Sequence, residues 1–102
     1  MFEDGIAAAV KLLSTRAPAT LGECSASALV PVGGPTPSTR LYIDAMPKGQ
    51  GSFADGMKAA INLLSRYKVA RGPRGWGLTE TGMPSVDMQL FIAELQRMRV
   101  TA

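Results

Sequence analysis

The chain of 102 residues lacks histidine altogether and has a single cysteine. Without an imidazole there is no Ser-His or Cys-His nucleophile, no histidine general base and no histidine metal ligand. Cys24 alone forms neither an internal disulfide nor a zinc knuckle, and nothing in the cysteine content argues for secretion. We therefore expect a cytoplasmic protein with no metal and no other cofactor, and these absences favour a non-enzymatic function.

Long apolar runs are also missing. The longest uncharged stretch, residues 24–39, contains three prolines and two glycines and therefore cannot span a bilayer as a helix. The acidic pair Glu3-Asp4 follows Met1 and Phe2, whereas the first residues of a signal peptide are basic. No membrane partner is expected. The remaining composition, 46% hydrophobic and 19% charged, fits one compact domain over residues 1–102.

The clearest pattern within the chain is a repeated segment. Residues 2–14 align with residues 53–65, and eight of the aligned positions are identical. Apolar residues in both copies recur at helical spacing, which predicts two similar helices, at residues 2–15 and 53–66. Each copy has an early glycine, Gly5 or Gly56, although glycine costs about 1 kcal/mol relative to alanine in a helix. The glycines indicate either a close approach by another backbone or merely an easier first helical turn.

Short strands are predicted between these helices, at residues 26–32 and 40–46, on either side of a stretch rich in glycine and proline. After the second repeated helix, residues 69–84 are predicted to form a flexible arm that holds a short extended piece around residues 76–79. Ser85 then caps a last helix, whose apolar stripe is expected in the core. The predicted order is α-β-β-α-arm-α, a small α+β domain in which the two similar helices pack on a short sheet.

Basic residues gather in and just before this arm. Residues 56–79 contain five lysines and arginines and no acidic residue, and the C-terminal half of the chain holds the whole excess of the net charge of +3. A flexible segment with cations and an aromatic ring is typical of segments that follow phosphates and stack on bases. The alternative is a solvated loop whose tryptophan folds back onto the core. The predicted nucleic-acid-binding residues are Arg66, Lys68, Arg71, Arg74 and Trp76.

A weaker candidate is the glycine-rich stretch at residues 46–53, which leads into the second repeated helix. Free N–H groups at a helix N-terminus attract anions, and the predicted anion-binding residues are Lys48, Gly49, Gly51 and Ser52. The stretch matches neither a Walker A loop nor the GxGxxG pattern. We favour the alternative, a tight turn in which Ser52 only caps the helix.

Two functions of different classes fit these patterns. The first is a small nucleic-acid-binding or regulatory protein that uses the basic, aromatic-containing arm. The second is a homo-oligomeric interaction or assembly module, a homodimer through its helix faces, that binds no nucleic acid. Anion or nucleotide binding at residues 46–53 is a weaker third hypothesis. No catalytic residue is assigned, because Cys24 has no base to activate it and Asp44, at the end of a predicted strand, is a lone carboxylate.

Overall fold

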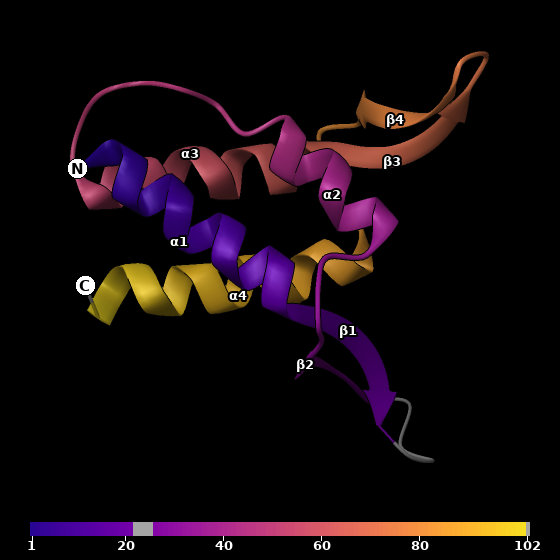
Figure 1. The fold of residues 1–102 in the computed structure, drawn as a ribbon, viewed down its shortest axis with the longest axis horizontal. Helices are drawn as coiled ribbons and strands as arrows, with labels where there is room; N and C mark the ends of the chain where they lie inside the picture. Colours follow the sequence, from indigo (N-terminus) through magenta and orange to yellow (C-terminus); the bar gives the residue numbers. More distant parts are fainter. Residues whose placement is uncertain (22–25, 102) are drawn as a thin grey trace.

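The computed structural model describes residues 1–21 and 26–101, which form helices and two-stranded antiparallel sheets in two successive helix–hairpin–helix units (Figure 1). The first unit comprises α1 (Phe2–Thr15), β1 (Arg16–Leu21), β2 (Ala26–Pro31) and α2 (Pro37–Asp44). The second comprises α3 (Phe53–Arg66), β3 (Tyr67–Gly72), β4 (Gly75–Glu80) and α4 (Val86–Thr101). The α+β class is confirmed, and both similar helices have the predicted bounds.

The two similar helices, α1 and α3, run in the same direction from neighbouring N-termini and pack against each other (Figure 1). A Cβ atom added to Gly5 would overlap the carbonyl oxygen of Phe53 and lie 2.7 Å from the backbone nitrogen of Met57. Reciprocally, a Cβ on Gly56 would overlap the carbonyl oxygen of Phe2. The two backbones therefore touch at the glycines, which confirms the close approach and explains why both helices contain a residue of low helix propensity.

Helix α4 packs on α3, runs in the opposite direction and completes the core (Figure 1). Met88, Phe91 and Leu95 of its apolar stripe are buried, so this stripe is core, as predicted. Ser85 caps the helix, because its hydroxyl accepts a hydrogen bond from the Met88 N–H at 3.2 Å. The buried core residues of the other helices are Ala9, Leu12, Leu13, Tyr42, Met57, Ala60 and Leu64.

One predicted strand, at residues 40–46, is wrong, because most of these residues belong to α2. The hydroxyl of Thr36 caps this helix by accepting a backbone N–H at 3.2 Å, and Pro37 stands in the first turn, where its missing N–H leaves no hydrogen bond unmade. Tyr42 is 1% exposed, and its hydroxyl donates to the carbonyl oxygen of Tyr67 at 2.8 Å. Capping and the burial of Tyr42 therefore outweigh the strand preference of tyrosine and isoleucine.

Each hairpin begins directly at the end of a helix. Arg16 continues α1 into β1, and Tyr67 continues α3 into β3, both with extended backbone angles. Strand β2 confirms the strand predicted at residues 26–32, whereas its partner β1 has no counterpart in the prediction. The two hairpins leave the helices at the same end and diverge, so that the tip of the β3–β4 hairpin projects beyond the helices (Figure 1).

Candidate functional site

The predicted basic arm, residues 69–84, contains most of the β3–β4 hairpin. The ladder closes with Gly72 opposite Gly75, and Pro73 and Arg74 form the turn between them. Proline suits the first central position of a turn because its ring holds φ near −65°, and Gly75 has a φ of 108°, which favours glycine. The short extended piece predicted in the arm is confirmed as β4, and the flexibility of the arm stays a prediction.

Strand alternation sorts the side chains of the hairpin onto two faces. Arg71 lies directly opposite Trp76 in the ladder, so both side chains leave the same face. The Val69–Leu78 pair lies on this face nearer the helices and packs, partly buried, against the core. Lys68 points from the other face. One face of the hairpin therefore extends from the core outward to an arginine and a tryptophan.

The end of the hairpin is exposed, cationic and aromatic. Trp76 is 66% exposed and does not fold back into the core. Arg71 and Arg74 are exposed, and within the described residues neither is part of an ion pair. The one acidic residue of the hairpin, Glu80, lies at its root and accepts a hydrogen bond from the Tyr67 hydroxyl at 3.3 Å. Arg71, Arg74 and Trp76, called here the cationic tip, therefore lie at the far end of the hairpin from its single carboxylate, which leaves their positive field uncancelled within the hairpin.

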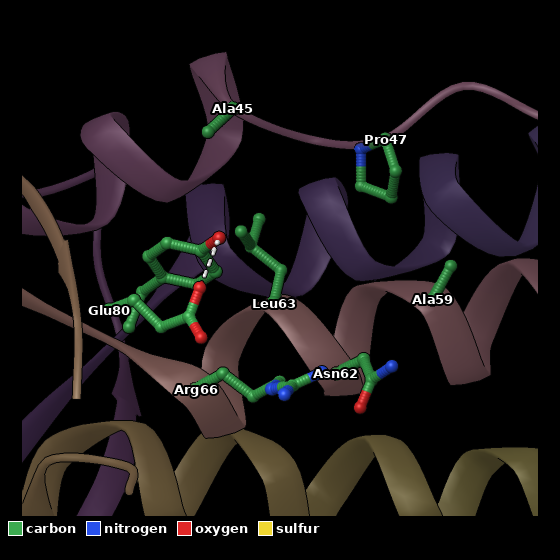
Figure 2. Close-up of a pocket in the computed structure, with 8 residues that line it drawn as sticks. Ala45, Pro47, Ala59, Asn62, Leu63, Arg66 and Glu80 are labelled. Carbon is green, nitrogen blue, oxygen red and sulfur yellow. Dashed lines mark hydrogen bonds between the residues drawn. The ribbon is translucent and has the colours of Figure 1, made fainter. Parts of the chain in front are cut away.

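Two predicted binding residues, Arg66 and Lys68, lie apart from the cationic tip. Arg66 ends α3 and lines a hollow of about 260 Å³ together with Asn62, Tyr67 and Glu80. Figure 2 shows Arg66 extending along α3 toward Asn62, away from the hydrogen bond that ends on Glu80. Lys68 is half-buried. Of the five residues predicted to bind nucleic acid, the fold thus brings three together and leaves Arg66 and Lys68 at the root of the hairpin.

Trp76 lines a groove whose opposite wall, a face of α2, was not predicted from the sequence. Residues of α2 and β3 line a groove of about 320 Å³ beside the Trp76 ring. The prediction of a strand at residues 40–46 left this wall out, because these residues belong mostly to α2 and the wall is a face of that helix. The signal that reveals it is Thr36-Pro37, since a threonine followed by proline marks the N-cap and first position of a helix.

The second candidate, at residues 46–53, ends in the N-cap of α3. The Ser52 hydroxyl accepts the Asp55 N–H at 3.2 Å, and the Asp55 carboxylate accepts the Ser52 N–H at 2.9 Å. The hydrogen bond from the Ser52 backbone, and then that with its hydroxyl, lowers the pKa of Asp55. The backbone N–H and the hydroxyl of Ser52 are therefore both hydrogen-bonded within the cap, as the tight-turn alternative requires.

The rest of this stretch packs against the start of α1. The carbonyl oxygen of Gly51 accepts the Phe2 N–H at 2.8 Å. A Cβ added to Gly49 would lie 3.2 Å from the Phe2 ring, which is closer than ordinary van der Waals contact. The absence of a side chain at Gly49 therefore leaves room for the ring. Lys48 is exposed. Gly49 and Gly51 thus make structural contacts in this fold, and anion binding by these residues stays a prediction.

The remaining polar candidates add no site. Asp44 is exposed and ends α2 rather than a strand, and Cys24 lies outside the described residues. Within residues 1–21 and 26–101, no group of three or more cysteine, aspartate or glutamate side chains could hold a metal ion. None of the helices in that part of the chain is long and apolar enough to cross a membrane.

Comparison of the chain with protein-family models, with curated proteins and with solved structures gave no match. A fold by itself does not establish a function, because one architecture serves many activities. The chemistry of the cationic tip and of the groove beside it is therefore the basis for a functional proposal.

Proposed function

We propose that this chain is a small nucleic-acid-binding or regulatory protein, and that it binds nucleic acid through the cationic tip of the β3–β4 hairpin. The observation that carries the proposal is the exposure of Arg71, Arg74 and Trp76 together at the end of a projecting hairpin. Arginine binds phosphate with a planar fork of donors, and an exposed indole offers a face on which bases stack. Large aromatic residues are usually well buried, so 66% exposure of Trp76 favours a binding role.

The first hairpin provides a comparison within the same chain. Residues 16–31 contain one arginine, one glutamate and no aromatic residue. Residues 67–80 contain three lysines and arginines, one glutamate, a tyrosine and a tryptophan. Both segments form hairpins that leave the end of a helix, so the difference in composition is not a requirement of that architecture. It supports a separate task for the second hairpin.

The proposal is tested by titrating nucleic acid while the fluorescence of Trp76, the only tryptophan, is followed at two salt concentrations. The affinity measured from the quenching should fall by an order of magnitude or more between about 50 and about 200 mM salt, because binding to phosphates releases counterions. Arg71→Ala/Arg74→Ala should lower the affinity and reduce the salt slope by about two. Lys11→Ala/Lys58→Ala removes the same charge from exposed sites on α1 and α3 and should keep the slope. A flat titration at low salt would refute the proposal.

The alternative proposal is a homo-oligomeric assembly module. It is supported by two large apolar side chains: Met83, between β4 and α4, is 63% exposed, and Val86, the first residue of α4, is 71% exposed. Exposed apolar side chains that form one contiguous patch are typical of partner surfaces. Sedimentation at increasing protein concentration should then show a rising mass, whereas a constant mass of one chain would refute this alternative. The cytoplasmic location stays a prediction under either function.

A further inference from the structure

The groove beside Trp76 lies between α2 and the β3–β4 hairpin and has a volume of about 320 Å³. Helix α2 contributes one wall and the hairpin the other. The lining residues are Pro37, Ser38, Leu41, Val69 and Trp76. All except Ser38 have apolar or aromatic side chains, so the groove suits a flat or aliphatic group rather than an ion.

A hydrogen bond and core packing hold the two walls in place. The hydroxyl of Tyr42 in α2 donates to the carbonyl oxygen of Tyr67 at the start of β3, at 2.8 Å. On the hairpin side, Val69 and Leu78 pack against the core. The groove therefore exists before a ligand arrives, and little conformational entropy is lost in forming it.

Cations stand beside this groove on the hairpin. Arg71 lies directly opposite Trp76 in the ladder, so the two side chains leave the same face of the hairpin. The Cβ atoms of such a pair are about 5 Å apart. Arg74 lies in the turn, two residues before Trp76. A nucleotide has the complementary chemistry, because the faces of its base are flat and stack on aromatic rings while its phosphate is anionic.

We infer that the groove holds one unpaired base of a single-stranded nucleic acid. The base stacks on Trp76, Leu41 covers it from the α2 side, and Arg71 and Arg74 contact the adjoining phosphates. The inference rests on the proposed nucleic-acid binding and adds the class of ligand. In a duplex every base is paired and stacked, so a base reaches the groove only after it has been pulled out of the helix at a cost in free energy.

The test compares three probes of equal length: an oligothymidylate, the same sugar-phosphate strand without bases, and a DNA duplex. Binding is followed by the fluorescence anisotropy of a label on the probe, so that variants without Trp76 are measured in the same way. The oligothymidylate should bind about tenfold more tightly than the abasic strand, and also more tightly than the duplex. Equal, salt-dependent affinity for all three probes would overturn base insertion and leave the proposed function standing. No binding of any probe would overturn both.

Variants locate the base on the groove. Leu41→Ala and Trp76→Ala should each lower the affinity for oligothymidylate toward that for the abasic strand, and leave the affinity for the abasic strand unchanged. Trp76→Phe keeps an aromatic ring and should retain part of the preference, which separates stacking from loss of fold. Gln89→Ala truncates an exposed side chain of α4 outside the groove and should change neither affinity.

A second copy of the chain is the competing occupant of this groove. Sedimentation of the wild type and of Leu41→Ala without nucleic acid distinguishes it. A mass that rises with concentration in the wild type and not in the variant would assign the groove to self-association and overturn the inference. We expect the masses of the two proteins to be the same at every concentration.

Discussion

Replacing Gly5 with alanine should destabilise this fold, although the same change stabilises an isolated helix by about 1 kcal/mol. The added Cβ would lie 2.7 Å from the backbone nitrogen of Met57 and would overlap the carbonyl oxygen of Phe53. Both obstructing atoms belong to the backbone of α3 and cannot rotate away. Helices α1 and α3 must therefore separate by about 1 Å to restore ordinary van der Waals contact.

The magnitude follows from two opposing terms. Overpacking a well-packed interior costs about 1–3 kcal/mol, and the upper part of that range applies because separating the helices also loosens Ala9, Leu13 and Ala60, which are all fully buried. Subtracting the gain of about 1 kcal/mol in helix propensity leaves a net loss of about 2 kcal/mol in the free energy of unfolding. In a domain of this size that corresponds to a Tm lower by about 8–16 °C.

Urea unfolding followed by far-UV circular dichroism measures this loss directly. Gly56→Ala should behave like Gly5→Ala, because each glycine faces a carbonyl oxygen of the other helix. The control is Ala7→Gly at an exposed position of α1, which should cost about 1 kcal/mol and so measures the propensity term in the same helix. A Gly5→Ala protein that is more stable than the wild type would refute the close crossing of α1 and α3.

Two further predictions concern hydrogen bonds that hold α2 and α3. Tyr42→Phe removes the donor to the Tyr67 carbonyl oxygen and should lower the free energy of unfolding in urea by about 1 kcal/mol; an unchanged value would contradict that contact. Because hydrogen bonds with Ser52 lower the pKa of Asp55, its carboxylate stabilises the folded state above the ordinary carboxyl pKa of about 4, and this contribution is lost as the pH falls through the lowered pKa. Asp55→Asn should therefore be less stable at neutral pH and lose less stability on acidification, and identical pH dependence of the two proteins would refute the cap.

Much of the fold follows from local sequence patterns. Apolar spacing predicts α1 and α3 with the observed bounds, because a helix of fourteen residues repeats its buried face over several turns. Ser85 marks the start of α4 in the same way, since an N-cap acts on neighbouring N–H groups. The prediction at residues 40–46 was wrong because the apolar pattern of a segment this short fits a helix and a strand almost equally well.

The candidate site was only partly predictable for a related reason. Arg71, Arg74 and Trp76 are visible as a cluster because they lie within six residues of one another in the chain. Arg66 and Lys68 belong to the same cluster in sequence, but the end of α3 and the alternation of β3 direct them elsewhere. Leu41 is remote in sequence from Trp76, so no local pattern connects the two walls of the groove.

Local patterns along the chain are enough to specify the two similar helices, the last helix and the net positive charge of the second half, because periodicity, capping and charge act between neighbouring residues. Three features instead come from tertiary packing: Gly5 contacts Gly56, Tyr42 lies in a helix, and Trp76 is exposed beside α2. Each of these depends on contacts between residues far apart in the chain. Such contacts form only when the core packs, and packing then overrides local preference.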